Sequence, residues 1–426
     1  MENNIEKNQA IQDKFEYCRL YFESGNTRPY EARRRQLLQL QQKIKDLTPE
    51  IEQALKTDLN NAPFEAYMTE IGLVLDEISY ALKHLKRWMK PRRRRPALTQ
   101  MPGSLRIIPE PYGVVLVMSP WNYPFLLALG PLIGAIAAGN TIVLKPSAYS
   151  PATSAVLEQV LSTIEPGWVE VVTGGREENQ NLLKLNFDYI FFTGSPAVAH
   201  GVMKHAADRL TPVTLELGGK SPAIVTADAD LELAARRIAF GKLVNAGQTC
   251  IAPDYVICAE TILEDFLRLL QKELSQVSQD PEYFAENYPK IINEKHFRRL
   301  EAYLAEIPPS FGGKLHPESR QIEPAIVTTP PLDSTLMQEE IFGPILPVIA
   351  VANLTSVIHY IQQRPKPLAV YIFSESKQTQ EELLEALSFG GGCINDTLVH
   401  MSSPRVPFGG VGNSGMGQYH GKYTFD

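Results

Sequence analysis

Cysteine is scarce in this chain, and its cysteines form no recognisable pattern. Cys18, Cys250, Cys258 and Cys393 are spread over 426 residues without a Cys-x-x-Cys pair. Their spacing therefore indicates neither a disulfide framework nor a zinc ribbon. Unpaired thiols are typical of a reducing compartment, so we expect a cytoplasmic protein.

Long apolar runs are also missing, and the first residues lack the pattern of a leader peptide. Residues 1–6 contain neither a basic nor an apolar stretch, so we expect no signal peptide. The longest apolar run, residues 125–138, is interrupted by Gly130 and Pro131. It is too short to span a bilayer and predicts a buried helix instead.

The histidines and the charge balance argue against two further classes of protein. The eight histidines lack metal-ligand spacing, so we expect no metal site. The formal net charge is −7, and 21% of the residues are charged. This balance is typical of a soluble globular protein and does not indicate nucleic-acid binding.

Two changes of pattern divide the chain. Residues 12–89 have helical spacing, which the basic segment 90–96 interrupts. From Gly113 onward strands alternate with helices, which predicts a parallel sheet. A second alternation runs from 223 to 373, so we expect an α/β protein. The strands expected in the first sheet are 114–118, 141–145, 169–172, 189–193 and 213–216.

A carboxylate and a cysteine occupy two short motifs. Glu216 lies in Thr-Leu-Glu-Leu-Gly-Gly-Lys, and Cys250 ends Asn-Ala-Gly-Gln-Thr-Cys. A cysteine with a carboxylate, and without a histidine motif, suggests thiol attack on a carbonyl followed by activation of water. Each residue alone has a plainer interpretation, because most lone cysteines are buried and most glutamates are solvated.

Two further motifs favour catalysis. Asn122 follows an expected strand, in a loop that Pro120 and Pro124 restrict. Its amide can be aimed at a fixed point, at a strand end where α/β proteins bind ligands. The fourth motif is Glu-Glu-Ile-Phe-Gly-Pro at 339–344. Four motifs together are a much stronger signal than any single one.

The order and spacing of these motifs resemble the aldehyde dehydrogenase superfamily. The resemblance extends to Pro-Phe-Gly-Gly at 407–410, and residues 411–422 resemble the class 3 and fatty aldehyde dehydrogenase branch. It implies two Rossmann-like parallel-sheet domains and a small oligomerisation arm. The implied boundaries are 1–90 and 112–217 for the dinucleotide-binding domain, 218–408 for the catalytic domain, and 91–111 and 409–426 for the bridging segment.

The same resemblance implies NAD(P)-dependent oxidation of aldehydes to carboxylic acids. Cys250 would form a thiohemiacetal and then a thioester. Asn122 and the Cys250 backbone N–H would stabilise the oxyanion, and Glu216 would activate water.

Local patterns also indicate a dinucleotide site. Ser195 is a suitable N-cap and Pro196 a suitable first residue for a helix whose start could hold a phosphate, although an ordinary strand-to-helix turn would look the same. Lys145 ends a strand, where its ammonium could reach a ribose or phosphate. By resemblance, the cofactor-contacting residues are Trp121, Lys145, Ser147, Ala148, Gly194, Ser195, Ala199, Leu217, Gly218, Glu340 and Phe342.

Two positions depart from the family pattern. Ala199 stands where relatives usually have glycine, and alanine is small enough to be tolerated. Ala148 stands where a glutamate commonly holds the adenosine ribose. Without that carboxylate a 2′-phosphate is not repelled, so we expect the chain to use NADP as well as NAD.

The resemblance also implies a largely aromatic and apolar aldehyde tunnel, which favours hydrophobic aldehydes, medium- or long-chain aliphatic or aromatic. For each residue, ordinary core packing is the competing interpretation. The tunnel residues are Tyr67, Tyr123, Thr249, Ile251, Thr397, His400 and Phe408.

Arg92–Arg95 admit two interpretations. By resemblance they begin an intersubunit arm, as in the commonly dimeric class 3 branch, so we expect a homodimer. A run of arginines is otherwise a solvated face, or one that makes weak contact with an anionic membrane surface.

Two alternative functions remain open at this stage. A thiol esterase or acyl transferase would use Cys250 and Glu216 without a dinucleotide. A non-catalytic dinucleotide-binding protein would keep the fold but would have no need of Cys250, Glu216 and Asn122 together.

Overall fold

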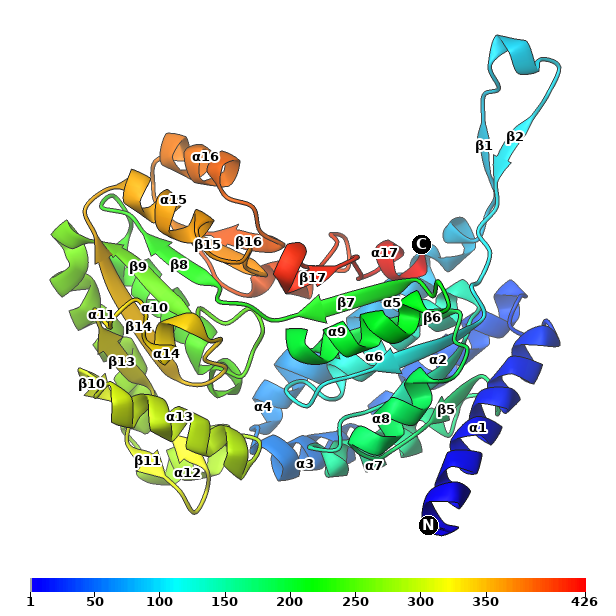
Figure 1. Cartoon of the computed structure of the whole chain (residues 1–426), viewed down its shortest axis with the longest axis horizontal. Helices are drawn as coiled ribbons and strands as arrows, with labels where there is room; N and C mark the ends of the chain where they lie inside the picture. Colours follow the sequence, from blue (N-terminus) through cyan, green and yellow to red (C-terminus); the bar gives the residue numbers. More distant parts are fainter. Residues whose placement is uncertain (1) are drawn as a thin grey trace.

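The computed structural model describes the backbone of residues 2–426 and the side chains of residues 6–426. Two α/β lobes lie side by side, and a thin hairpin projects from one of them (Figure 1). The N-terminal part is helical as expected. Its helices are α1 (Glu2–Glu23), α2 (Tyr30–Asp46), α3 (Thr48–Leu59), α4 (Pro63–Ala66), the π-helical η1 (Tyr67–Ile71) and α5 (Gly72–Trp88).

The first lobe is built on a six-stranded sheet in the order β17-β7-β6-β3-β4-β5. All neighbours are parallel except β17, which runs antiparallel to β7. The five strands expected from the sequence are confirmed to within one residue at each end. The strands are β3 (Val114–Met118), β4 (Thr141–Lys145), β5 (Val169–Val171), β6 (Tyr189–Gly194), β7 (Val213–Leu217) and β17 (Gly415–Met416).

Helices cover both faces of this sheet, which explains why its central strands are apolar throughout. Val114, Leu116 and Met118 pack with α1, α8 and α9, whereas Val115 and Val117 face α5 and α6. The run at 125–138 forms the buried helix that was predicted. The helices of this lobe are α6 (Leu126–Ala138), α7 (Pro151–Leu161), α8 (Arg176–Leu183) and α9 (Pro196–Ala207).

The second lobe contains a seven-stranded sheet in the order β10-β13-β14-β9-β8-β15-β16. Only β10, at the edge, is antiparallel to its neighbour. The strands are β8 (Pro222–Val225), β9 (Tyr255–Ala259), β10 (Phe311–Gly312), β13 (Ala325–Thr328), β14 (Ile345–Val351), β15 (Ala369–Phe373) and β16 (Gly391–Ile394). A small ribbon pairs β11 (Leu315–His316) with β12 (Gln321–Ile322).

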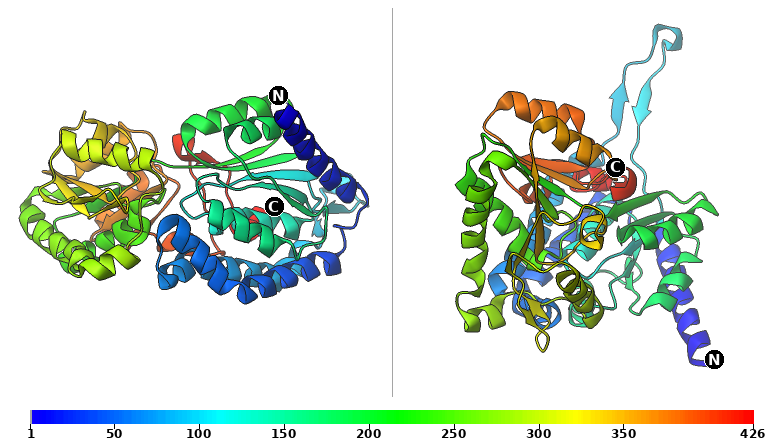
Figure 2. Two further views of the ribbon diagram at one scale, coloured as in Figure 1. Left: turned by 90° about the horizontal axis from the view of Figure 1, so that it is seen from below. Right: turned by 60° about the vertical axis from the view of Figure 1, so that its left-hand side comes forward.

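Helices flank this second sheet as well (Figure 2). The longer ones are α10 (Leu231–Leu243), α11 (Leu263–Ser275), α12 (Pro281–Asn287), α13 (Glu294–Glu306), α15 (Leu354–Gln362) and α16 (Lys377–Ala386). The short ones are α14 (Thr335–Gln338), η3 (Val244–Gly247), η4 (Glu260–Ile262), η5 (Gln276–Ser278) and η6 (Val399–Ser402).

The two segments expected to form the bridging unit, 91–111 and 409–426, have different surroundings. Strands β1 (Arg92–Arg94) and β2 (Leu105–Ile107), with η2 (Leu98–Gln100) between them, form the projecting hairpin (Figure 1). The C-terminal part, with η7 (Gly412–Ser414) and α17 (Lys422–Phe425), instead packs on the first lobe. There β17 extends the first sheet and α17 contacts α6.

Within residues 2–426, no helix is both long and apolar enough to cross a membrane.

Candidate active site

The carboxyl ends of the first sheet define where a ligand can bind. After β3 the chain proceeds to β4 and β5 on one side and then returns to β6 and β7 on the other. In such a sheet the strand order reverses beside β3, and ligands bind outside the carboxyl ends at this point. Trp121 and Asn122 follow β3, Gly194 ends β6, and Glu216 lies near the end of β7.

The second lobe contributes Cys250 through an unusual turn. After α10, the turn η3 places Asn245, Ala246 and Gly247 in the left-handed region, at φ 51°, 50° and 71°. Gln248 is fully buried, and its amide Nε2 donates to the carbonyl oxygens of Asn245 and Lys290, both at 3.1 Å. The buried glutamine therefore holds the backbone immediately before the cysteine.

Direct hydrogen bonds join the Asn122 loop to the Cys250 loop. Asn122 Nδ2 donates to Gln248 O at 3.0 Å, and Asn245 Nδ2 donates to Asn122 O at 2.7 Å. The hydroxyls of Tyr123 and Thr249 lie 2.5 Å apart. An amide NH2 has two hydrogens, so Asn122 keeps a second donor for a ligand. Asn122, Tyr123, Thr249 and Cys250 are thus brought together, as expected from the sequence.

The surroundings of Cys250 keep its thiol neutral. Cys250 lies deep in the protein yet retains partial solvent access. Burial raises the pKa of its thiol well above 9, and the nearby carboxyl groups of Glu216 and Glu340 raise it further. Because the thiolate is the nucleophile, attack requires positive charge or hydrogen-bond donors close to the sulfur.

Glu216 is buried on β7, where it pairs with Gly415 of β17. Only 2% of its surface is exposed, and its Oε1 has no hydrogen-bond partner among the described residues. Burial raises the pKa of this carboxyl well above 4.5, although the Gly410 N–H opposes the shift. A buried carboxyl oxygen without a partner is suited to hold a water molecule or a reacting group.

The Gly218–Gly219 pair forms a cradle against Glu340. Gly219 N donates to Glu340 Oε1 at 3.1 Å, and a Cβ on Gly218 would collide with the same carboxyl group. Burial raises the pKa of Glu340 to about 8. Phe342 lies edge-on against Trp121, with ring centroids 5.3 Å apart.

Lys220 and Asp254 hold this cradle together, and the sequence analysis assigned neither a role. Lys220 Nζ pairs with the Asp254 carboxylate and donates to Leu336 O and Glu339 O. Asp254 Oδ1 accepts from Ile341 N at 2.9 Å. These contacts fasten the segment carrying Glu340 to the Gly-Gly turn. The only sequence signal for them was the lysine directly after two glycines.

Lys145 is more enclosed than a flexible phosphate ligand would be. Its Nζ donates to Pro146 O at 2.7 Å and to Gly174 O at 2.6 Å. Burial lowers the pKa of this ammonium to about 8. Ser147 is partly exposed and Ala148 is exposed, so both border the space outside the end of β4.

The start of α9 is exposed but has few open backbone donors, because Pro196 has no N–H and Val198 N and Ala199 N both donate to Ser195 O at 3.1 Å. Ser195 occupies the N-cap position but makes no side-chain capping bond, and both it and Pro196 are exposed. Ala199 is buried against the sheet, where its methyl group fits. Leu217 is buried at the end of β7. The residues present fit a dinucleotide, with an exposed helix start at Ser195 and a glycine cradle at Gly218.

The expected tunnel residues differ in exposure and in hydrogen bonding. Tyr67 is 49% exposed, whereas Thr397 is fully buried and its hydroxyl donates to Arg237 O at 2.7 Å. His400 Nδ1 lies 3.4 Å from Cys393 Sγ. Ile251 and Phe408 are buried.

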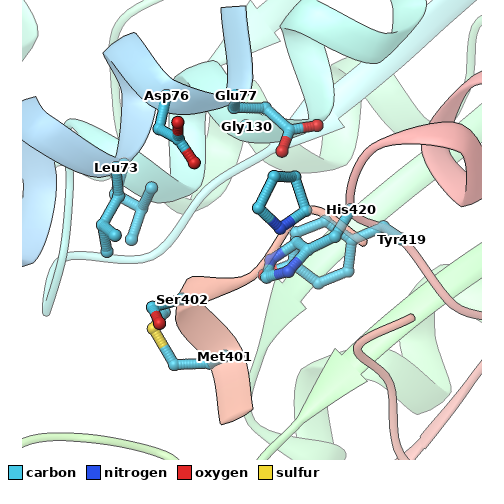
Figure 3. Close-up of a pocket in the computed structure, with 10 residues that line it drawn as sticks. Leu73, Asp76, Glu77, Gly130, Met401, Ser402, Tyr419 and His420 are labelled. Carbon is cyan, nitrogen blue, oxygen red and sulfur yellow. The ribbon is translucent and has the colours of Figure 1, made fainter. Parts of the chain in front are cut away.

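A pocket between α5 and residues 401–420 is lined by other residues (Figure 3). Asp76 and Glu77 of α5 lie on one side, and Met401, Ser402 and His420 lie on the other (Figure 3). The full lining is Leu73, Asp76, Glu77, Leu126, Gly130, Met401, Ser402, Pro404, Tyr419 and His420.

Tyr419 lines this pocket and also lies near Glu216 and Cys250. Burial raises the pKa of its phenol, and Glu216, Cys250 and Glu77 raise it further, so all three lie near its ring. In the sequence, Tyr419 and His420 are only part of the resemblance at residues 411–422. Their place at the site depends on a C-terminal segment folding back over the first lobe.

The chain is similar to known proteins over nearly its whole length. Residues 6–426 match the model of the aldehyde dehydrogenase family. The 4,4'-diaponeurosporen-aldehyde dehydrogenase of Staphylococcus aureus is 46% identical over 419 residues, covering 98% of this chain and 91% of the relative. A mouse (Mus musculus) relative, "aldehyde dehydrogenase, dimeric NADP-preferring", is 43% identical over 410 residues, covering 95% and 90%.

A solved structure is also closely similar. The substrate-bound state of Staphylococcus aureus AldH superposes with a TM-score of 0.95 at 45% identity, covering 97% of this chain and 91% of that one. With a family match over nearly the whole length, the chain belongs to the aldehyde dehydrogenase family and is an oxidoreductase that oxidises aldehydes with NAD or NADP.

Proposed function

We propose that Cys250 is the nucleophile and that Asn122 and the Cys250 backbone N–H stabilise the oxyanion. The main support is the pair of hydrogen bonds that lock the Asn122 and Cys250 loops together. Cys250 Sγ attacks the aldehyde carbonyl, which gives a thiohemiacetal anion. One oxyanion donor is worth on the order of 3 kcal/mol in such sites.

Glu216 is proposed as the base that activates water for hydrolysis of the thioester. Its buried Oε1 is free to accept a hydrogen bond from that water. A raised pKa makes the carboxylate a stronger base than an exposed glutamate. Hydrolysis releases the carboxylic acid and returns Cys250 to its thiol form.

The cofactor is proposed to lie across the carboxyl ends of the first sheet. The nicotinamide group, when bound, accepts the hydride from the substrate carbon. Glu340 and Phe342 would contact the nicotinamide half, and the start of α9 would hold the pyrophosphate. Towards the adenosine end lie Lys145, Ser147 and the exposed Ala148. Because no carboxylate stands at Ala148, we propose that both NAD and NADP are accepted.

For the substrate we propose hydrophobic aldehydes, medium- or long-chain aliphatic or aromatic. The pocket of Figure 3 is proposed as part of their path, because Tyr419 lines it and also lies near Glu216 and Cys250. Leu73, Leu126 and Met401 give it apolar walls. Asp76 and Glu77 would disfavour aldehydes that carry a negative charge.

Reduction of each cofactor, followed at 340 nm with a series of aldehydes, tests this proposal. We expect kcat/KM to rise from acetaldehyde to octanal and benzaldehyde, and to be low for an aldehyde with a free carboxylate. A preference for short or anionic aldehydes would contradict the substrate assignment. Absence of turnover with any aldehyde would contradict the assignment of the catalytic residues.

The domain division and the assembly are proposals of the same kind. We propose residues 1–90 and 112–217 as the dinucleotide-binding domain, 218–408 as the catalytic domain, and the hairpin as an intersubunit arm in a homodimer. The four cysteines are free, which supports a cytoplasmic location.

A further inference from the structure

Two glutamates lie on a short segment between the two catalytic loops. Glu65 is on α4 and Glu70 is on η1, and Glu70 is fully buried. Neither side chain belongs to the proposed chemistry. Carboxyl groups are rarely buried without a specific partner, so their contacts call for an explanation.

Glu65 binds the turn that leads to Cys250. Its Oε1 accepts the backbone N–H of Asn245 at 2.6 Å. Asn245 is the first of three successive left-handed residues, and two of the three have side chains. Such residues adopt this conformation only when their surroundings hold them there. The Glu65 carboxyl group is one of these restraints.

Glu70 binds the loop that carries Asn122. Its Oε2 accepts from Phe125 N at 2.7 Å and from Leu126 N at 3.0 Å. These are free N–H groups at the start of α6, directly after the Asn122-Tyr123-Pro124 stretch. The Glu70 carboxyl group therefore fixes the point at which the Asn122 loop enters α6.

The π-helical turn reduces the angle between the directions of the two side chains. Residues five apart on a regular α-helix point roughly 140° away from each other. In η1 the N–H of Gly72 bonds to Tyr67 O, five residues earlier, which widens the turn and reduces this angle. π-turns often occur at functional sites for such a reason.

We propose that Glu65 and Glu70 are positioning residues that set the Asn122 donor and the Cys250 nucleophile at their working separation. The inference rests on the proposed roles of Asn122 and Cys250. A glutamine keeps a carbonyl oxygen at the same place as either carboxyl group. The proposed positioning role requires a hydrogen-bond acceptor and no negative charge, so glutamine should fulfil it.

The test compares variants that keep or remove this acceptor. We expect Glu65→Leu and Glu70→Leu to slow single-turnover formation of NAD(P)H at least tenfold, with the aldehyde KM changed less than threefold. Glu65→Gln and Glu70→Gln should stay within threefold of wild type. Glu50→Leu, at an exposed position on the neighbouring α3, is the matched control and should behave as wild type.

Hydrogen exchange gives a readout that does not depend on turnover. Glu65→Leu should increase exchange at residues 245–250, and Glu65→Gln should not. If Glu65→Leu fails to fold, Glu65→Asp replaces it, because a carboxyl group one methylene shorter loses its reach to Asn245 N.

Two results would overturn the proposal: wild-type turnover in both leucine variants, or glutamine variants as impaired as the leucine ones. The second result would show that charge or a proton matters. Cys250→Ala separates this failure from failure of the proposed function. If Cys250→Ala keeps its turnover, the nucleophile assignment is wrong, whatever the glutamates do.

Discussion

At the residue scale, burial controls the protonation of the catalytic groups. Burial raises the pKa of Cys250, Glu216 and Glu340, so all three favour their neutral forms. Three mutually repelling ionised groups would be costly in this low-dielectric site. In the free enzyme the Cys250 thiol therefore stays protonated. A positive charge near the sulfur would favour the reactive thiolate.

Cys250→Ala should abolish aldehyde oxidation, because no other described side chain can form the thioester here. Cofactor binding should stay within about threefold of wild type, since the thiol is not part of the Gly218–Glu340 cradle. Fluorescence titration with each cofactor measures the binding, and absorbance at 340 nm measures the turnover. Activity above a trace would remove Cys250 from its role.

Glu216→Gln should separate the two halves of the reaction. A stoichiometric burst of NAD(P)H is expected, followed by a steady state at least a hundredfold slower, because water is no longer activated. Rapid-quench kinetics and intact-protein mass spectrometry would show the burst and the trapped acyl-enzyme. A variant with neither would place Glu216 outside deacylation.

Ala148→Glu should restore discrimination against NADP. Two unit charges 4 Å apart repel by about 4 kcal/mol at an intermediate dielectric, but this position is exposed and solvent weakens the effect. We therefore expect kcat/KM with NADP to fall about tenfold relative to that with NAD, or roughly 1.4 kcal/mol. Ala148→Gln is the uncharged control. Equal effects on both cofactors, or a wild type inactive with NADP, would contradict the prediction.

At the element scale, short irregular segments place the reacting groups. The sheets set the approximate positions of Asn122 and Glu216, whereas η1 and η3 set the details through π-helical and left-handed backbone. Such segments are stable only when distant partners satisfy them, as Glu70 does for the start of α6. Their stability is therefore coupled to the protonation of buried carboxyl groups.

Glu70→Gln should flatten the dependence of stability on pH. Burial raises the pKa of Glu70 to about 8 from 4.5, so between these values the folded protein holds a proton that the unfolded chain has released. The free energy of unfolding then falls as pH rises, by at most about 1.4 kcal/mol per pH unit for one group.

Urea unfolding at pH 5, 6, 7 and 8 measures this slope. The free energy of unfolding of Glu70→Gln should fall less with rising pH than that of wild type. The exposed control Glu50→Gln should have the wild-type dependence. Identical slopes for all three proteins would show that Glu70 stays ionised in the folded state.

At the scale of the whole molecule, the hairpin of β1 and β2 projects from the first lobe without burying its strands against it. All residues of β1 and β2 are exposed, and Arg93 lies opposite Arg106 in the ladder. An isolated two-stranded ribbon is marginally stable, and like charges facing each other weaken it. Leu98 near the tip is 92% exposed and Met101 is 61% exposed. A second copy of the chain would cover these residues.

Light scattering at micromolar concentration should therefore give about twice the mass of one chain. Leu105→Lys with Ile107→Lys, on one strand of the hairpin, should shift the mass towards that of a monomer. The same substitutions at Leu384 and Leu332, which are exposed elsewhere, are the control. A wild-type monomer at this concentration would contradict the proposed dimer.

The sequence by itself determined the elements and the chemical identity of the site. Runs such as Val114–Met118 predict strands because β-branched and apolar side chains favour a sheet covered on both faces. The catalytic motifs were readable because each combines a reactive side chain with nearby glycines or prolines that shape its loop. These signals are local, so neighbouring residues suffice to detect them.

Only the tertiary structure decided what surrounds those motifs. The contacts of Glu65 with Asn245 and of Asp254 with Ile341, and the position of Tyr419 near Glu216 and Cys250, depend on segments far apart in the chain. For the same reason, the pocket lined by Leu73, Met401 and His420 could not be predicted from the sequence, because its walls come from segments far apart in the chain. Which side chains meet in a pocket depends on how two lobes and a returning C-terminal segment pack, and no local pattern encodes that packing.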